Sequence, residues 1–224
     1  MSSYTVQNAC TVGWHMHTRK THWEGVYSAK SPQEVSWYEE VPAVSLQFIH
    51  DAHLGFDEPI IDVGGGASRL VEFLLAAGHT HLAVLDISAH ALALARERLG
   101  DHASEVEWFD EDVTWFEPPH RFSLWHDRAV FHFLAAPADR QRYVEVLKRT
   151  LGPRGHVIIA TFALDGPSKC SGLDVVRYDA PKLMAELGDG FNLVAERKQD
   201  HVTPAGGRQS FAWFRLTWMA SLTS

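Results

Sequence analysis

The sequence has little cysteine: Cys10 and Cys170 are its only two, and they lie far apart in the 224-residue chain. They form no C-x-x-C pair, which removes the usual zinc-binding spacing and is typical of a reducing compartment. We therefore expect a cytoplasmic protein. Histidines are numerous, but neither local pair, His15 with His17 or His79 with His81, has a third ligand at matching spacing. No metal site is predicted.

Long apolar runs and an excess of basic residues are also absent. The longest apolar stretches, such as VIIATFAL, are too short to cross a bilayer, and the N-terminus has no apolar segment behind positive charge. Lys and Arg total 20 against 28 Asp and Glu, a formal charge of −8, and no basic run could follow a phosphate backbone. We expect neither a membrane nor a nucleic acid as partner.

The chain does contain a regular alternation of strand-like and helix-like segments after residue 58. Five apolar runs read as buried strands with helical segments between them, which requires parallel pairing with right-handed crossovers. The last two strand segments, FNLVAERKQDHV and SFAWFRLTW, are joined by a short loop and predict an antiparallel hairpin at one sheet edge. The predicted fold is α/β: a doubly wound, mostly parallel seven-stranded sheet, its last strand antiparallel, with helices on both faces.

Residues 1–54 differ from the rest because they are dense in Trp, His and Tyr. We interpret them as an N-terminal extension that ends in a helix and packs on one Rossmann-like domain of residues 55–224. Two interpretations of Trp23, Trp37 and Tyr38 stay open. They either cover the core or form a lid over a ligand.

The stretch IIDVGGGAS places glycines between a strand and a helix. Gly64 and Gly66 match the start of a dinucleotide fingerprint, but Arg69 stands where the third glycine belongs, which argues against a pyrophosphate ligand. Asp62, ahead of the glycines, repels phosphate and attracts an ammonium group, while the glycines let backbone approach an uncharged part of the ligand. An amino-acid-bearing nucleoside meets both requirements.

Carboxylates also end the next two strands. Asp86 is placed to accept hydrogen bonds from both ribose hydroxyls, and Asp112 with Val113 is placed to reach an adenine edge. Asp110 shares the strand face of Asp112, so that assignment is open. Each Asp alone is equally a helix or turn cap. Three strand-end carboxylates in succession favour a nucleoside site.

With these residues the chain resembles the class I S-adenosylmethionine-dependent methyltransferases, over about residues 55 to 218. The resemblance implies S-adenosylmethionine as cofactor and S-adenosylhomocysteine as product. It implies that three glycines contact the methionine and ribose portions, that Asp86 holds the ribose, and that two residues lie beside the sulfonium. The residues so implied are Gly64, Gly65 and Gly66; Asp86; Ile87, Asp112 and Val113 around the adenine; and His126 and Asp127 at the sulfonium.

The segment HWEGVYSAKSPQEVSWYEE is similar to the opening of a methyltransferase subgroup whose Trp and Tyr residues close over the cofactor. That subgroup holds small-molecule and protein-lysine enzymes, and its lysine-modifying members carry D-K-G-T-[LF]-D on the fourth strand. This chain has D-R-A-V-F-H from Asp127 to His132. The final imidazole weakens the protein-lysine assignment.

Methyl transfer is an in-line displacement in which the protein mainly aligns the nucleophile and excludes water. A hydroxyl or ammonium acceptor needs a base, for which His132, His126 and Asp127 are candidates, whereas a thiolate or selenolate needs none. Other residues are candidates for contacts to the acceptor. They are Tyr38, Arg128, Cys170 and Tyr178, although Cys170 is equally explained as a small buried hydrophobe.

The function predicted from the sequence is methyl transfer to a small molecule, with sulfur or selenium favoured over oxygen or nitrogen as the accepting atom. Protein-lysine methylation is the alternative, and a non-catalytic nucleoside-binding module is a more remote one. A nicotinamide oxidoreductase is disfavoured by Arg69 and by the lack of a hydride-transfer set such as Tyr-x-x-x-Lys. The sequence does not determine the oligomeric state.

Overall fold

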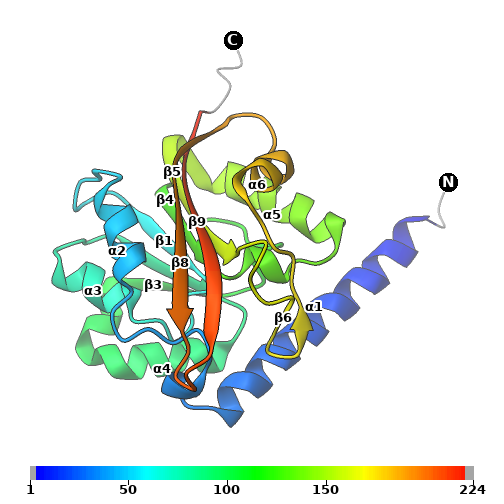
Figure 1. Ribbon diagram of the computed structural model, residues 1–224, viewed down its shortest axis with the longest axis horizontal. Coiled ribbons are helices and arrows are strands. Elements are labelled where there is room, and N and C mark those ends of the chain that lie inside the picture. The colour runs from blue at the N-terminus through cyan, green and yellow to red at the C-terminus, as the bar shows by residue number, and fades with distance from the viewer. Residues whose placement is uncertain (1–3, 220–224) are drawn as a thin grey trace.

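The computed structural model describes residues 4–219, and the side chains of residues 17–219. Cys10 and His15 lie outside the described side chains. Seven strands form one sheet in the order β3-β2-β1-β4-β5-β9-β8 (Figure 1). Their bounds are β1 Ile60–Val63, β2 Leu82–Asp86, β3 Val106–Asp110, β4 Phe122–Arg128, β5 Leu151–Phe162, β8 Phe191–Val202 and β9 Arg208–Trp218.

Strand pairing agrees with the predicted fold class. The first five strands of the sheet pair in parallel, β9 pairs antiparallel to β5, and β8 and β9 form the expected hairpin at the edge. The strand order reverses between β1 and β4, where chains of this type leave a crevice at the carboxyl ends of their strands. The sheet therefore places its binding crevice at the ends of β1, β2 and β4.

Helices cover both faces of the sheet. Neighbouring residues of a strand point to opposite faces, and residues on both faces are therefore buried. Ile61 of β1 packs in a cluster with Trp125, Tyr143 and Leu183, whereas Ile60 packs in a cluster on the other face. The helices are α2 Ala43–His50, α3 Leu70–Ala76, α4 Ala89–Leu99, α5 Pro137–Thr150 and α6 Ala180–Leu187. Asp179 caps α6, since its side chain accepts a hydrogen bond from the Lys182 N–H.

The helix expected at the end of residues 1–54 is α2, and it contributes Val44 and Phe48 to the same apolar cluster as Ile60. A longer helix, α1 (Tyr4–Ala29), precedes it and was not predicted. Figure 1 shows α1 running along one side of the molecule with its C-terminal end beside α4. Glu24 of α1 accepts a hydrogen bond from the Ala89 N–H (2.8 Å) and thereby satisfies a free donor at the start of α4.

A long loop leads from β5 to α6. It contains a small antiparallel hairpin of β6 (Lys169–Cys170) and β7 (Leu173–Asp174) before α6 begins. Short 3-10 turns at Pro32–Glu34, Gly100–Glu105 and Phe131–Phe133 complete the described elements. Cys170 of the β6–β7 hairpin lines the same cavity as Gly64, which directly follows β1. The hairpin therefore lies near the carboxyl ends of β1 and β4.

Candidate active site

Two adjoining cavities open at the carboxyl ends of β1, β2 and β4. The main cavity comprises about 860 Å³ of empty space and the side cavity about 580 Å³, both including space that is open to solvent. Both contact Gly64, Trp37 and Arg128, so the two spaces meet at the glycine turn. This is the crevice that the strand order predicts.

The glycine turn, residues 64–66, lies so close to neighbouring side chains that a Cβ atom at any of its positions would collide with one of them. Gly64 has φ +67°, and a Cβ on it would lie 2.0 Å from Cγ2 of Val130. A Cβ on Gly65 would lie 2.7 Å from an Asp62 oxygen, and one on Gly66 would lie 2.6 Å from an Asp86 oxygen. Of the three, Gly64 lines both cavities and Gly65 lines the side cavity. Gly66 lines neither, and its lack of a side chain makes room for Asp86.

Asp62 lines the side cavity and is held by a buried histidine. His126 Nδ1 lies 2.7 Å from Asp62 Oδ1, and its Nε2 lies 2.9 Å from Ser45 Oγ. Both ring nitrogens are therefore engaged, and His126 lines the side cavity but not the main one. The predicted role of His126 as a base stays a prediction, and these two contacts do not favour it. Ser45 had no signal in the sequence, because its partner is far away in the chain.

Asp86 ends β2 in the wall of the main cavity, next to Ile87. Its carboxylate is 7% exposed and accepts a hydrogen bond from the Ser88 N–H at 2.8 Å. Burial raises the pKa of Asp86 from 3.8 to about 7, and the neighbouring charges of Asp62 and Glu24 add to the rise. A cationic ligand with hydroxyl donors would stabilise the ionised carboxylate against both its burial and the repulsion by Asp62 and Glu24.

Asp112 and Val113 line the main cavity, whereas Asp110 does not and instead pairs with Lys20. The Asp112 carboxylate accepts hydrogen bonds from the backbone and side chain of Thr114 and forms a 2.8 Å ion pair with Arg19 of α1. Asp112 thus anchors α1 to the site. Arg19 also lines the cavity and was missed in the sequence, since nothing local distinguishes it from other surface arginines.

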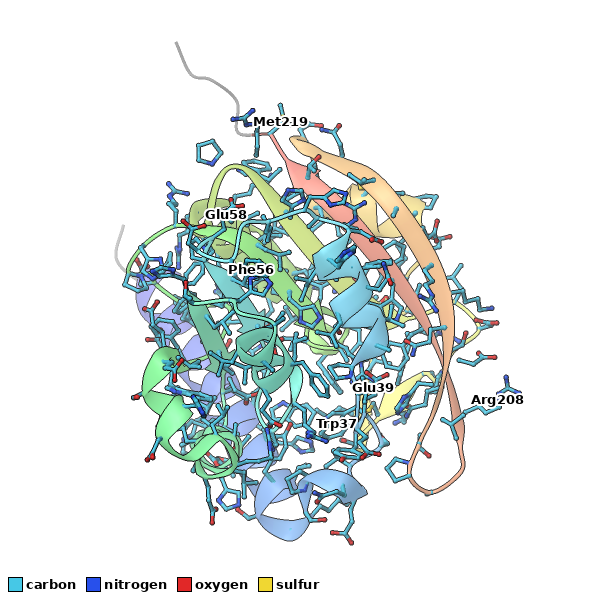
Figure 2. The ribbon with its side chains drawn as sticks, turned by 90° about the vertical axis from the view of Figure 1, so that its left-hand side faces the viewer. Trp37, Glu39, Phe56, Glu58, Arg208 and Met219 are labelled. Atoms are coloured by element: carbon cyan, nitrogen blue, oxygen red, sulfur yellow. The ribbon has the colours of Figure 1, made fainter. Side chains whose placement is uncertain are left out.

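The segment before α2 closes over both cavities. Trp23 and Trp37 line the main cavity with their ring centroids 5.8 Å apart, and Tyr38 lines the side cavity. Arg128 donates a hydrogen bond to the Trp37 carbonyl at 2.7 Å and pairs with Glu39 at 3.2 Å. Figure 2 shows Trp37 and Glu39 together just below α2. Trp37 also packs against the apolar cluster of Ile60, and both tryptophans pack against the cluster of Tyr27, Ala67 and Ala91, so they contact the core as well as the cavity.

Asp127 does not stand where a base would meet an acceptor. Its oxygens accept hydrogen bonds from the N–H groups of Val130 (2.8 Å) and Phe131 (3.1 Å) and from the Tyr143 hydroxyl (2.5 Å). Burial raises its pKa to about 6, and it lines neither cavity. The residue holds the turn after β4, and its predicted catalytic role stays a prediction that these contacts do not favour.

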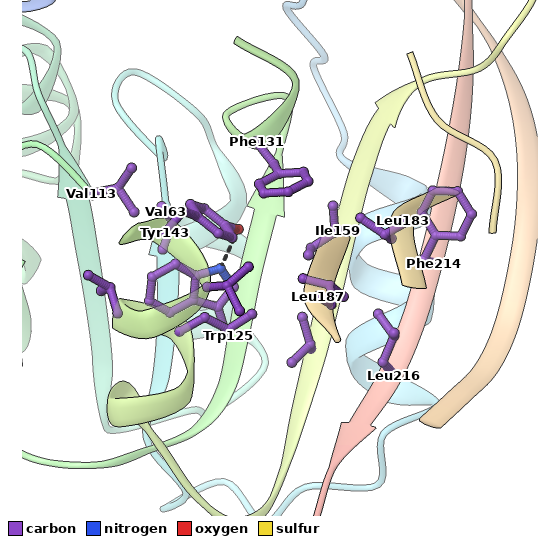
Figure 3. Packing of buried hydrophobic residues seen from close by; sticks show 14 of the residues in the cluster. Val63, Val113, Trp125, Phe131, Tyr143, Ile159, Leu183, Leu187, Phe214 and Leu216 are labelled. Atoms are coloured by element: carbon purple, nitrogen blue, oxygen red, sulfur yellow. Dashed lines mark hydrogen bonds between the residues drawn. The ribbon is translucent and has the colours of Figure 1, made fainter. Parts of the chain in front are cut away.

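Tyr143 links Asp127 to the core. Its hydroxyl also accepts a hydrogen bond from Trp125 Nε1 at 2.8 Å, drawn as the dashed line in Figure 3. We expect Tyr143→Phe to lower the free energy of unfolding by about 1–3 kcal/mol, because the Trp125 donor loses its partner and Asp127 loses one of its donors. Denaturant titration measures this loss. An altered affinity for the ligand of the main cavity would contradict the structural role of Asp127.

Tyr178 lies in the core and lines neither cavity, so its position does not favour the predicted contact with an acceptor. It is fully buried against Phe131, with ring centroids 5.3 Å apart. Cys170 does line the main cavity, and burial raises the pKa of its thiol. A thiol that stays protonated agrees with the interpretation of Cys170 as a small apolar wall residue.

Among the described residues, no three His, Cys, Asp or Glu side chains gather where they could hold a metal ion. Within the same residues, no helix is both long enough and apolar enough to span a bilayer.

Residues 61–157 match a family model described as a methyltransferase domain, and no curated protein matches the chain. Solved structures resemble it over most of its length. One is the 1,6-didemethyltoxoflavin N1-methyltransferase of Burkholderia thailandensis, at 20% identity and TM-score 0.63, covering 95% of this chain and 89% of that one. The chain has the methyltransferase fold.

Two further structures share this fold. One comes from work on the conversion of a disulfide bond into a thioacetal group during echinomycin biosynthesis, at 15% identity and TM-score 0.73, covering 90% of this chain and 92% of that one. The other is the N-methyltransferase NodS of Bradyrhizobium japonicum WM9 in complex with S-adenosylhomocysteine, at 16% identity and TM-score 0.63, covering 80% and 89%. In each case the match extends over most of both chains, so the likeness concerns the whole fold.

Proposed function

We propose that this protein transfers a methyl group from S-adenosylmethionine to a small molecule bound in the main cavity. The main cavity itself carries the proposal. It joins a buried strand-end carboxylate, Asp86, to a wall of aromatic side chains under the closed Trp37 segment. A nucleoside at the carboxylate would place its reactive sulfur towards the aromatic wall.

The residues of the two cavities suit the parts of this cofactor. Asp86 is placed for the ribose hydroxyls, and Ile87 and Val113 offer apolar surface to the adenine. In the side cavity Asp62, oriented by His126, suits the ammonium group of the methionine portion. Arg69 lines the same cavity and suits its carboxylate. Similar structures were crystallised with S-adenosylmethionine or S-adenosylhomocysteine, which supports the assignment.

A small acceptor is favoured by the enclosure of the main cavity, and sulfur or selenium is favoured as its nucleophile. The 1,6-didemethyltoxoflavin N1-methyltransferase supports a small acceptor, and the structure connected with conversion of a disulfide bond into a thioacetal group supports a reaction at sulfur. NodS and the glycopeptide N-methyltransferase MtfA methylate nitrogen, so the preference for sulfur or selenium rests on the cavity of this chain. Residues 1–54 would then be the lid of the 55–224 domain, in a cytoplasmic enzyme.

Calorimetry with S-adenosylhomocysteine, S-adenosylmethionine and NAD tests the cofactor. We expect one site per chain for both adenosyl compounds, and no heat of binding for NAD, because a carboxylate and not a phosphate cradle faces the glycine turn. Tight NAD binding would contradict the proposal. Incubation of the protein with a cell extract and radiolabelled cofactor tests the acceptor class. Label in protein bands would instead support lysine methylation.

A further inference from the structure

His132 is the one predicted base that does line the main cavity, and its surroundings decide which nitrogen carries its proton. The side chain is fully buried. Its Nδ1 accepts a hydrogen bond from the Phe162 N–H at 3.2 Å. A neutral imidazole has one donor and one acceptor nitrogen, so the proton resides on Nε2. This Nε2 is buried, and among the described residues no group bonds to it.

The same contact prevents His132 from acting as a base. Protonation would turn Nδ1 into a second donor facing the Phe162 N–H, and it would create a buried charge near Arg128. Burial, with a smaller contribution from Arg128, lowers the pKa of His132 to about 3. The ring therefore stays neutral through the physiological range, with an N–H to donate and no site to receive a proton.

No other described group of the main cavity replaces it as a base. Asp112 is held by Arg19 and Thr114, and the Cys170 thiol has a raised pKa. Asp86 stands at the ribose position, and Asp127 and His126 lie outside this cavity. An acceptor that must lose a proton during methylation would find no partner here, because proton transfer requires a group within hydrogen-bond distance.

The shape of the wall restricts the acceptor further. The ring centroid of Phe133 lies 4.5 Å from that of His132 and 4.9 Å from that of Trp23. The ring centroid of Phe162 lies 4.7 Å from that of His132. Arg128 is neutralised by Glu39 and covers the Phe211 ring at 5.3 Å. These rings pack edge to face or tilted against one another, and a wall rich in aromatic side chains favours an acceptor with apolar aromatic surface.

Resting on the proposed function, we propose that the acceptor is a planar aromatic thiolate or selenolate that carries an adjacent oxygen or nitrogen, and that His132 Nε2–H donates a hydrogen bond to that atom. His132 is then a residue that orients the substrate. The acceptor's lone pair forms the bond to the methyl carbon as the carbon–sulfonium bond breaks. The electron pair of that bond stays on sulfur, the products are a thioether or selenoether and S-adenosylhomocysteine, and no proton moves.

Two probes that are ionised near neutral pH test this assignment. Thiobenzoate carries a carbonyl oxygen beside its sulfur, and 4-chlorobenzenethiolate carries none. Initial rates of S-methyl product, corrected for the rate without enzyme, are measured by mass spectrometry. The variants are His132→Phe, which removes the donor, and His132→Asn, which keeps an N–H. The matched control is His79→Phe, a buried histidine that lines neither cavity.

We expect wild-type protein to methylate both probes, with kcat/KM for thiobenzoate the higher. In His132→Phe, kcat/KM for thiobenzoate should fall about 10- to 100-fold, the value of one hydrogen bond to a charged acceptor, mostly through KM. The value for 4-chlorobenzenethiolate should change less than about threefold on the same grounds. His132→Asn should recover part of the loss, and His79→Phe should change neither probe.

Several outcomes would overturn the assignment. Equal losses for both probes in His132→Phe would mean that the ring is merely structural. Failure of wild-type protein to methylate either probe, with S-adenosylhomocysteine still bound, would exclude the acceptor class. Methylation of phenols or amines with an acid limb in the pH–rate profile that His132→Phe removes would make His132 a base. Absence of any S-adenosylhomocysteine binding would defeat the proposed function itself, so the two failures are distinguishable.

Discussion

Replacing Asp86 with asparagine is expected to weaken S-adenosylhomocysteine binding about 100-fold at pH 8, because two hydroxyl donors lose a charged acceptor. The side-chain carbonyl of the introduced asparagine would still accept the Ser88 N–H, so the turn after β2 should persist. Calorimetry gives the dissociation constant. Asp110→Asn is the matched control, since Asp110 ends the neighbouring strand β3 but lines neither cavity.

The pH dependence provides a second test of the same residue. The pKa of Asp86 is about 7 in the free protein, so below that pH a proton must leave before the carboxylate can accept both hydroxyls. We expect the wild-type dissociation constant to rise as the pH falls below 7, by up to about tenfold per unit. The dependence should be lost in Asp86→Asn. A wild-type affinity independent of pH between 5 and 8 would contradict the assigned role.

Asp86→Asn should weaken ligand binding but increase the stability of the free protein. A raised pKa means that the folded protein holds the Asp86 proton more tightly than the unfolded chain does. That contribution is fully present below pH 3.8 and is lost as the pH rises to about 7. Asparagine does not titrate, so the variant should gain stability over wild type across this window, by at most about 4 kcal/mol above pH 7. Denaturant titrations at pH 5 and 8 measure the difference.

Gly64→Ala is expected to be the most damaging substitution at the glycine turn. The residue has φ +67°, which costs about 1 kcal/mol for a side chain, and its Cβ would meet Val130 at 2.0 Å, an overlap that costs about 1–3 kcal/mol more. We expect the free energy of unfolding to fall by about 2–4 kcal/mol on these grounds, with loss of S-adenosylhomocysteine binding. Denaturant titration and calorimetry measure the two effects.

The chain offers a matched control for the backbone part of this cost. Gly206 has φ +82°, and a Cβ there would have no heavy atom within 4 Å. Gly206→Ala should therefore show only the conformational cost of about 1 kcal/mol. The double variant Gly64→Ala/Val130→Ala should recover part of the collision energy. Equal losses for Gly64→Ala and Gly206→Ala would mean that Val130 simply rotates away, and the close approach would then have no energetic weight.

Much of the site was predictable because its signals are local. Asp62, the glycines and Asp86 each follow an apolar run, and the ends of parallel strands meet at one edge of a sheet. Their placement at the two cavities also depends on the strand order, which the structure supplies. The aromatic residues Trp23 and Trp37 also stood out by composition, and only the folded chain shows that both line the main cavity.

The chemical roles were less predictable, and His132, His126 and Asp127 illustrate the reason. All three are titratable residues at or after the end of β4, and the sequence offers them equally as bases. The structure separates them by their partners: the Phe162 N–H for His132, Asp62 and Ser45 for His126, and Tyr143 with two backbone donors for Asp127. The partner of His132 is 30 positions away in the chain.

The sequence by itself determined the α/β class, the strand pairing and the row of acidic strand ends, since apolar periodicity and turn residues act between near neighbours. Only the tertiary structure decided which carboxylates are bound by Arg19 or Tyr143, which histidine nitrogen keeps its proton, and that α1 forms and caps α4. These outcomes depend on hydrogen bonds and burial between residues distant in the chain. A buried group takes its protonation state and its role from such partners, and no local pattern records them.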